Sequence, residues 1–403
     1  MTPTARDVRA ARAAVETVAR RTPILSTRTF SERAGGTVVL KAENLQRTGS
    51  FKVRGVAAKL AALGEEGCAK GVVAASAGNH AQALAAGAKA RGIRCEVFVP
   101  TEAPMAKVEA ARSSGAIVHI GGNSVDECVH AALERAQTGG LAFVHPFDDP
   151  AIVAGQGSLG LELLEDVEDL AQVVVPVGGG GLCAGVALVV KEVKPDVRIV
   201  GVQAAACAPY PESMQRGEPV EASSALTIAD GIAVKRPGGI PLAILRTHLD
   251  DMVLVDEEAT AAAMALLMER CKLVVEGAGA VGVAAILGGK VEAVAGTTVA
   301  VLSGGNVDAT LLAAIARRHE TESGRRLVAL TRVADRPGGL ATLLAAVAQT
   351  GANIVDVSHV REGLALHVRE TAVELVLETR GHEHAQRVLE ALHDEGYEAQ
   401  VLR

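Results

Sequence analysis

The segment VVVPVGGGGLCAGVALVV, residues 173–190, joins an apolar run typical of a buried strand to four consecutive glycines and a second apolar run of helical length. Glycines let successive backbone N–H groups face the same way, and the start of the following helix favours a negative charge. An ordinary strand-to-helix turn needs only one or two glycines. The segment therefore predicts an α/β sheet with a phosphate-binding loop, formed by Gly178, Gly179, Gly180 and Gly181.

This loop does not fit the two common nucleotide-binding patterns. The P-loop pattern GxxxxGK[ST] does not occur in it, and the pattern GxGxxG fails because Cys183 takes the place of the third glycine. A literal GxGxxG occurs at residues 277–282, but no acidic residue ends the next apolar run, 297–303, to hold a ribose. We interpret Gly277 and Gly279 as positions of close backbone approach and expect no dinucleotide.

Apolar runs rich in strand-forming residues alternate with Ala-, Leu- and Glu-rich stretches of helical length through most of the chain. Such alternation predicts parallel sheets covered by helices, and continuously apolar strands are typical of sheets buried on both faces. Because the candidate strands are many for one sheet, we expect two α/β lobes. The candidate strands are residues 37–44, 71–76, 95–100, 116–120, 142–147, 172–177, 197–203 and 297–303.

The pattern changes after Arg318. The polar segment HETESGRR, residues 319–326, is expected to be a linker. After it, the order of apolar runs and helical stretches predicts a compact β-α-β-β-α-β unit of the ferredoxin-like kind, with a last short strand after Tyr397. We expect this unit to be a separate domain. Its elements are strand 326–334, turn 335–339, helix 340–351, strands 353–360 and 372–380, and helix 384–396.

The composition limits the classes of function. With 403 residues, 49% hydrophobic and 22% charged, the chain is expected to be a soluble globular protein of two or three domains. A net charge of -7 without a basic run argues against nucleic acid as a partner. No signal peptide or bilayer-spanning segment is expected, so a cytoplasmic location is the default. Six scattered cysteines predict core thiols of a reducing compartment, with neither disulfides nor a metal site: Cys68, Cys95, Cys128, Cys183, Cys207 and Cys271.

A lysine between apolar neighbours stands in TGSFKVRG, residues 48–55. Desolvation lowers the pKa of an amine, so Lys52 either extends its head to solvent or is placed to react. A lone lysine of this kind is more often a surface residue. Together with a phosphate loop, however, Lys52 indicates pyridoxal phosphate, which binds a lysine covalently and needs its phosphate held.

Two further loops each follow a predicted strand. SAGNHAQ, residues 76–82, offers a hydroxyl, helix-start amides, an amide side chain and a histidine, which suit a substrate carboxylate. An ordinary helix capped by Ser76 would look similar. LSGGN, residues 302–306, places Ser303 where strand ends meet ligands in open α/β sheets. Each loop is ambiguous when taken alone.

SFKVRG, SAGNHAQ, PVGGGGL and LSGGN, in this order, resemble the motifs of the fold-type II, tryptophan synthase β-like, pyridoxal-phosphate enzymes. The resemblance is greatest to the threonine ammonia-lyases and covers residues 5–318. It implies a two-lobed catalytic domain over residues 1–320, with a small lobe at about 45–150. The C-terminal unit, residues 325–403, is similar to an ACT domain, with a turn DRPGGL at 335–340 and a strand in GANIVDV at 351–357.

The resemblance also implies roles for individual residues. Lys52 would carry the cofactor and act as acid and base, and Phe51 would line the ring edge. Asn79 would bond the cofactor's 3-hydroxyl oxygen, and Ser303 would face the pyridine nitrogen. The four glycines 178–181, with the amide of Leu182, would bind the phosphate. The substrate carboxylate would be held by the loop Ser76, Ala77, Gly78, Asn79 and His80, and the ring would be flanked by Gly231 and Glu276.

The implied reaction is β-elimination and deamination of L-threonine to 2-oxobutanoate and ammonia, with L-serine as a second substrate. Serine racemases share most of these motifs, but Ala77 stands where racemising relatives carry a second serine. Gln203 and Pro209 replace the acidic residues of metal-binding relatives, so no metal is expected. A non-catalytic amino-acid sensor is the alternative of another class. A homodimer or homotetramer is expected, and the effector at the ACT domain, isoleucine, valine or none, stays open, as does a biosynthetic or catabolic role.

Overall fold

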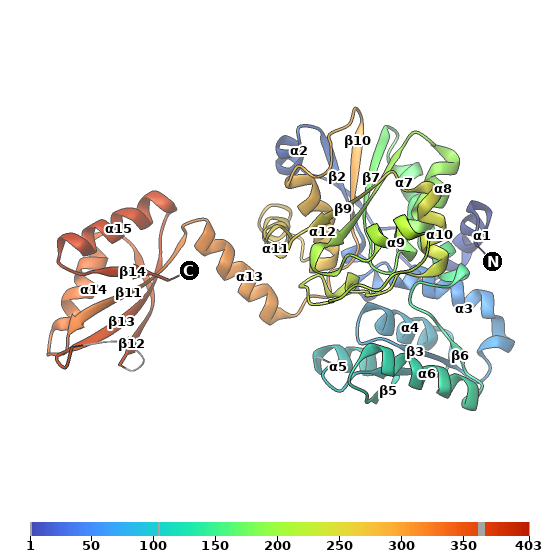
Figure 1. Ribbon diagram of the computed structural model, residues 1–403, viewed down its shortest axis with the longest axis horizontal. Helices are drawn as coiled ribbons and strands as arrows, with labels where there is room; N and C mark the ends of the chain where they lie inside the picture. Colours follow the sequence, from blue (N-terminus) through green and yellow to red (C-terminus); the bar gives the residue numbers. More distant parts are fainter. Residues whose placement is uncertain (1, 104, 362–366, 403) are drawn as a thin grey trace. The chain divides into compact units, whose positions relative to one another are not determined.

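The chain folds into two compact units, one up to Asp308 and the other from Ala309 on, in a computed structural model that describes residues 2–103, 105–361 and 367–402 (Figure 1). The boundary expected from the sequence at 320–325 differs, because helix α13, Ala309–Glu322, groups with the C-terminal unit. This helix also occupies the first half of the expected linker. An ion pair between Arg318 and Glu322 at 2.7 Å, one helical turn apart, supports its last turn.

Within the described residues, the larger sheet of the first unit has the strand order β1-β2-β10-β7-β8-β9. Neighbouring strands are parallel except β1 and β2, which are antiparallel. Strand β10 is buried along its whole length, as expected for a sheet covered by helices on both faces. The strands are β1 (Ile24–Ser26), β2 (Thr37–Ala42), β7 (Leu170–Pro176), β8 (Arg198–Ala204), β9 (Asp251–Val255) and β10 (Thr297–Leu302).

The smaller sheet has the order β5-β4-β3-β6 in the described ranges, and all its strand pairs are parallel. Figure 1 shows this sheet with α4, α5 and α6 as a separate layer below the larger sheet. The two sheets confirm the expected pair of α/β lobes. The elements are β3 (Val72–Ala75), α4 (Asn79–Ala90), β4 (Cys95–Val99), α5 (Met105–Ser113), β5 (Ile117–Ile120), α6 (Val125–Gly139) and β6 (Ala142–Phe143).

Helix α3, Lys52–Cys68, connects the two lobes, because it packs on α4 of the small lobe and on α1 and α7 of the large lobe. Its first residue is Lys52, so the two lobes together determine where that amine lies. The other helices of this unit are α1 (Ala5–Glu16), α2 (Arg28–Ala34), α7 (Pro150–Asp166), α8 (Gly181–Val193), α9 (Tyr210–Arg216), α10 (Gly239–His248), α11 (Glu257–Leu266) and α12 (Gly277–Leu287). Short turns complete it: η1 (Glu43–Leu45), η2 (Arg47–Gly49), η3 (Ala205–Cys207), η4 (Asp230–Ile232) and η5 (Leu267–Cys271), the last a π-helical turn.

All the strands expected in the first unit are present, although that at 142–147 is only two residues long. Strands β1 and β9 were not expected from the sequence. Strand β1 has three residues and β9 is a partly exposed edge strand that starts at Asp251, so neither shows a long apolar run. All six cysteines are free thiols. None of the helices in the described ranges combines the length and the apolar character that a bilayer crossing requires.

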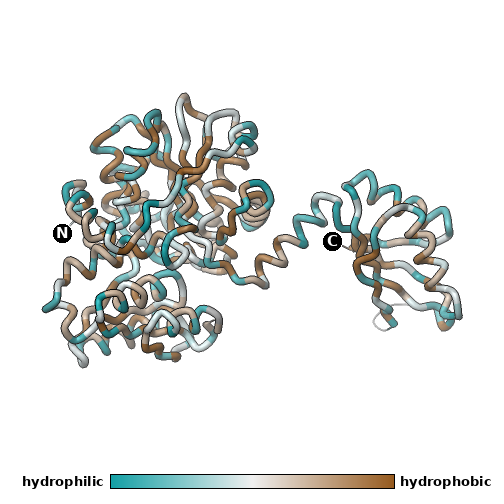
Figure 2. Tube along the Cα trace, turned by 180° about the vertical axis from the view of Figure 1, so that it is seen from behind, coloured by the Kyte–Doolittle hydropathy of each residue, from teal (hydrophilic) through white to brown (hydrophobic). Residues whose placement is uncertain are grey.

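The C-terminal unit has the expected β-α-β-β-α-β order after α13. Over its described residues the sheet is antiparallel, with the order β12-β13-β11-β14, and α14 and α15 pack on each other. Figure 2 shows hydrophobic residues along the central strands and hydrophilic residues on the outer helix α15. The predicted last strand is present. The elements are β11 (Arg326–Ala334), α14 (Gly339–Gln349), β12 (Asn353–Val360), β13 (Glu370–Glu378), α15 (His382–Asp394) and β14 (Ala399–Val401).

Candidate active site

The lysine loop, residues 48–52, is hydrogen-bonded to the LSGGN loop, residues 302–306. Ser50 and Gly304 form an isolated antiparallel bridge, and the Phe51 N–H donates to the carbonyl of Ser303 at 3.1 Å. The Gly305 N–H donates to the carbonyl of Gly49 at 2.9 Å. Because LSGGN follows β10 of the large sheet, these bonds place the start of α3 at the carboxyl end of that strand.

Lys52 begins α3, and its side chain is part-buried. Its Nζ donates to the carbonyl of Pro146 at 3.0 Å and lies 5.2 Å from the centre of the Phe51 ring. Burial lowers the pKa of the amine to about 8, and the nearby carboxyl of Glu276 partly opposes this shift. An amine with this pKa is neutral in a substantial fraction of molecules near neutral pH, which a nucleophile or base requires.

Asn79, Glu276 and Asn306 are joined by hydrogen bonds. Asn79 Nδ2 donates to Glu276 Oε1 at 2.7 Å, and Asn306 Nδ2 donates to Asn79 Oδ1 at 2.7 Å. Glu276 is only 4% exposed, and this burial, together with the charge of Asp230, raises its pKa to about 7. Asn306 is the last residue of LSGGN, and no role was expected for it from the sequence.

The SAGNHAQ loop leads from β3 into α4. The Gly78 N–H donates to Ser76 Oγ at 3.1 Å, and Gly78, not Ser76, occupies the cap position of α4. The alternative of a helix capped by Ser76 is therefore wrong. The first amides of α4 have no acceptor within the helix, so they are suited to an anion. Ala77 is part-buried against the apolar core of the small lobe.

His80 turns its ring away from this loop. The ring is buried, and its Nε2 donates to the carbonyl of Val144 at 2.9 Å. Burial, with the nearby Lys52, lowers the pKa of His80 to about 3, so the imidazole is neutral. Only the backbone of His80 is thus placed to assist an anion at the start of α4.

The four-glycine loop connects β7 to α8 and has no room for side chains. A Cβ on Gly179 would lie 2.2 Å from the Phe147 ring, and one on Gly180 would lie 1.8 Å from the Tyr210 hydroxyl. Gly180 also has a φ of +93°, which disfavours other residues. The Tyr210 hydroxyl donates to the carbonyl of Gly179 at 3.1 Å. Neither aromatic residue was expected at the site from the sequence.

Three further predicted residues, Gly178, Leu182 and Gly231, complete the region. A Cβ built on Gly231 would lie 3.1 Å from Glu276 Oε1, so Gly231 borders that carboxyl group. A Cβ on Gly178 would lie 2.9 Å from the Cα of Ile232, so the glycine loop packs closely against the turn η4, which also contains Gly231. Leu182 is buried in the large-lobe core as the second residue of α8. These contacts, with those of Lys52 and Asn79, bring the predicted residues into one region at the junction of the two lobes.

The position that is acidic in metal-binding relatives holds an amide here. Gln203 Nε2 donates to the carbonyl of Val177 at 3.2 Å, and its Oε1 accepts from the Tyr210 N–H at 3.0 Å. A carboxylate could not make the first of these bonds. Across the described parts of the chain, no cluster of three or more His, Cys, Asp or Glu side chains is arranged to hold a metal ion.

Residues 15–304 match the sequence profile of a family described as pyridoxal-phosphate dependent enzymes. The chain belongs to this family. Proteins named L-threonine ammonia-lyase are similar over the whole length: that of Geobacter sulfurreducens is 45% identical, covering 95% of this chain and 96% of its own, and that of Thermotoga maritima is 42% identical over 99% of both. Among solved structures, maize serine racemase has a TM-score of 0.74 at 32% identity and covers 80% of this chain and 99% of its own.

The residues present fit pyridoxal phosphate, the cofactor of this family. The glycine loop carries no side chains and leads directly into the start of α8, as a phosphate site needs. Lys52 supplies the amine with a lowered pKa. Next to it, Ser50 Oγ and Thr48 Oγ1 are buried polar atoms that have no hydrogen-bond partner among the described residues. Buried polar atoms are normally paired, so these two mark a place built to meet another molecule.

Proposed function

We propose that this chain is a threonine ammonia-lyase, which converts L-threonine to 2-oxobutanoate and ammonia and also converts L-serine to pyruvate. One observation carries the proposal: the Lys52 amine, with a pKa of about 8, donates to the carbonyl of Pro146, and the loop that contains it is hydrogen-bonded to the loop that follows β10. Full-length relatives named L-threonine ammonia-lyase support the choice of substrate.

In this proposal each loop has a separate task. Lys52 would hold the cofactor covalently, and the N–H groups of the four glycines and of Leu182 would hold its phosphate. Asn79 would donate to the 3-hydroxyl oxygen, while Ser303, which is 3% exposed, would face the pyridine nitrogen. Phe51, Gly231 and Glu276 flank the ring. The substrate carboxylate is held by Ser76 and by the backbone of residues 77–80 at the start of α4, where the dipole favours an anion.

The reaction then follows from the proton chemistry of Lys52. When bound, pyridoxal phosphate withdraws electrons from the substrate's α-carbon. The Nζ of Lys52, when it is free and neutral, would remove the α-proton. The β-hydroxyl group leaves as water, and the resulting enamine hydrolyses to the oxo acid and ammonia. The neutral hydroxyl of Ser303 cannot hold the pyridine nitrogen protonated as a carboxylate would, which favours prompt elimination over reactions that need a longer-lived carbanion.

Serine racemisation is the second candidate, favoured by the similarity to maize serine racemase. Racemisation requires a proton donor on each face of the α-carbon. The methyl group of Ala77 has no exchangeable proton, and the neutral ring of His80 is bonded to Val144 away from the loop. Elimination therefore remains the better-supported reaction. Rapid exchange of the α-proton of L-serine with solvent, together with release of D-serine, would reverse this order.

The test uses the purified full-length protein with its cofactor. L-threonine should yield equal amounts of ammonia and 2-oxobutanoate, and the bound cofactor should absorb visible light. The variant Lys52→Ala should lose both properties, whereas Lys70→Ala, at an exposed position of the same lobe, should keep them. Turnover of L-threonine by Lys52→Ala at the unaltered rate would refute the mechanism. A coloured protein that releases no ammonia from L-threonine or L-serine would refute the substrate class.

We further propose that residues 325–403 form an ACT domain that binds a branched-chain amino acid and joins subunits of a homodimer or homotetramer. The β-α-β-β-α-β order and the turn DRPGGL at 335–340 support this assignment. Activity of the full-length protein, titrated with isoleucine and with valine, tests it. No response to either amino acid, with no binding by calorimetry, would leave the domain a role in assembly alone.

The free thiols support a cytoplasmic location.

A further inference from the structure

We infer that Asn306 is a positioning residue, which fixes the orientation of the Asn79 side-chain amide and so the hydrogen bond that Asn79 gives to the cofactor. The inference deepens the proposed function, because it assumes that Asn79 meets the 3-hydroxyl oxygen of pyridoxal phosphate. Asn306 has no other assigned role.

The orientation of Asn306 follows from its partners. Its Nδ2 donates to the backbone carbonyl of Thr48 at 2.8 Å and to Asn79 Oδ1 at 2.7 Å. A backbone carbonyl can only accept a hydrogen bond, so the amide nitrogen of Asn306 must face Thr48. Both of its N–H groups are then in use. The group that Asn306 presents to Asn79 is therefore a donor.

The orientation of Asn79 follows in turn. Because its Oδ1 accepts from Asn306, its Nδ2 faces Glu276, to which it donates one N–H at 2.7 Å. The second N–H of Asn79 remains for the cofactor oxygen. If the amide turned over, its carbonyl oxygen would face the cofactor oxygen instead, and two acceptors would meet.

Glu276 alone cannot enforce this orientation. With a pKa raised to about 7 by burial, its carboxyl group is protonated in about half of the molecules at neutral pH. A protonated carboxyl group can donate to Asn79 Oδ1 as readily as the ionised form accepts from Nδ2. Both orientations of the Asn79 amide can then be satisfied at Glu276. The donor from Asn306 is the contact that excludes one of them.

The backbone around Thr48 is shaped for this contact. Thr48 has a φ of +64° and Gly49 one of +73°, left-handed conformations that cost energy at a threonine. A Cβ on Gly49 would lie 2.3 Å from Asn306 Oδ1, so the side chain of Asn306 fills the space beside this turn. The same turn leads directly to Lys52. Asn306 thus links the lysine loop to Asn79 across three separate segments of the chain.

The variant Asn306→Asp tests this inference, because it conserves shape while its side chain becomes an acceptor toward Asn79. The amide of Asn79 should then turn its nitrogen to residue 306. The dissociation constant of pyridoxal phosphate from the full-length protein should rise about tenfold or more, the usual range for a lost hydrogen bond to a charged oxygen. The visible absorption maximum of the bound cofactor should shift as well. Asn353→Asp, at an exposed position, should change neither property.

A double-mutant cycle separates positioning from a general structural role. In the Asn79→Ala background, Asn306→Asp should have almost no further effect on cofactor affinity or on the absorption maximum. Equal effects in both backgrounds would overturn the inference, as would unchanged affinity of the single variant. Asn306→Ala, with apoprotein unfolding followed by circular dichroism, provides a second variant if the aspartate folds poorly. These readouts do not require turnover, so failure with L-threonine would refute the proposed function without affecting this test.

Discussion

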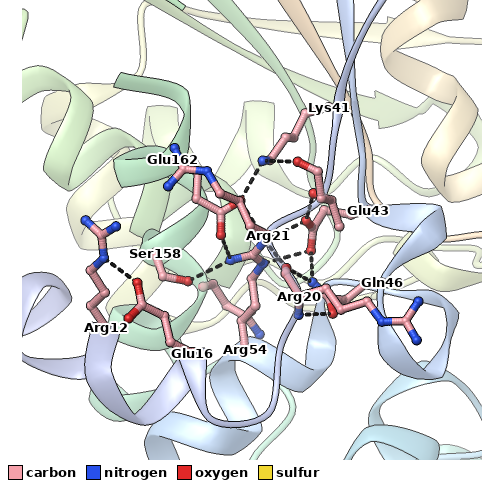
Figure 3. Close-up of polar contacts among 12 residues, drawn as sticks. Arg12, Glu16, Arg20, Arg21, Lys41, Glu43, Gln46, Arg54, Ser158 and Glu162 are labelled. Carbon is pink, nitrogen blue, oxygen red and sulfur yellow. Dashed lines mark hydrogen bonds and ion pairs between the residues drawn. The ribbon is translucent and has the colours of Figure 1, made fainter. Parts of the chain in front are cut away.

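Arg54 and Glu43 form a two-pronged ion pair that is almost completely buried. Arg54 Nε lies 2.8 Å from Glu43 Oε2 and its Nη2 lies 2.7 Å from Glu43 Oε1, with the side chains 1% and 0% exposed. Glu162 accepts from the remaining side of the guanidinium at 2.7 Å and also pairs with Lys41 (Figure 3). Although burial opposes it, Arg54 holds the pKa of Glu43 below its usual value. Since Arg54 lies two residues after Lys52 on α3, this network anchors the helix that carries the amine.

Replacing Arg54 should strongly destabilise the large lobe. Arg54→Met leaves the carboxylate of Glu43 buried without its main partner, and removing one member of a buried pair typically costs about 3–5 kcal/mol. Urea unfolding of the apoprotein, followed by circular dichroism, should show a clearly lower midpoint. Arg28→Met is the matched control, because its pair with Glu32 is exposed and worth less than about 1 kcal/mol. Equal midpoints for the two variants would contradict the role of the network.

The attachment of pyridoxal phosphate to Lys52 should depend on pH with a midpoint near 8. Burial lowers the pKa of Lys52 from 10.5 to about 8, and only the neutral amine attacks an aldehyde. The rate at which visible absorption develops on mixing apoprotein with cofactor should rise through pH 8 and then level off. The free amine of N-acetyl-lysine, measured in parallel, should still gain rate up to its ordinary pKa near 10.4. A protein rate that keeps rising to that pH would show an unperturbed amine.

Glu276 should make the apoprotein less stable as the pH rises from 4.5 to 7. Burial raises its pKa from 4.5 to about 7, so in this window the folded chain keeps a proton that the unfolded chain releases. The stabilising contribution is complete below pH 4.5 and is lost as the pH rises through 7. Glu276→Gln removes this dependence, and the difference in unfolding free energy between the two proteins should change by about 3 kcal/mol at most. A difference that stays constant across the window would mean that Glu276 has its ordinary pKa.

Gly180→Ala should abolish cofactor binding and destabilise the large lobe. The added methyl group would collide with the Tyr210 hydroxyl at 1.8 Å and would also occupy a backbone with a φ of +93°. Gly35→Ala isolates the backbone effect, because Gly35 has a φ of +69° but no atom within 4 Å of the added carbon. We expect the control to lose about 1 kcal/mol and keep its cofactor. Similar losses in both variants would show that the contact with Tyr210 is unimportant.

Much of the fold follows directly from the sequence, because buried parallel strands need long apolar runs and such runs can be recognised in the amino-acid sequence. The exceptions have physical causes. Strands β1 and β9 are short or partly exposed, so they show no such run. The segment expected as a linker begins within α13, because residues 319–322 are polar yet compatible with a solvated helix.

The candidate site, like the fold, could be predicted from the sequence only in part. The sequence by itself determined which loops are expected at the site, because the four-glycine loop, SFKVRG, SAGNHAQ and LSGGN each contain suitable polar groups within a few residues. Only the tertiary structure decided how these loops act on one another. The buried ring of His80, the contact of Tyr210 with the glycine loop and the donor from Asn306 to Asn79 join residues far apart in the chain. Hydrogen-bond direction and burial depend on three-dimensional neighbours. The neighbours of His80 and Tyr210 exist only once each lobe has folded, and the bond between Asn306 and Asn79 exists only once the two lobes have come together.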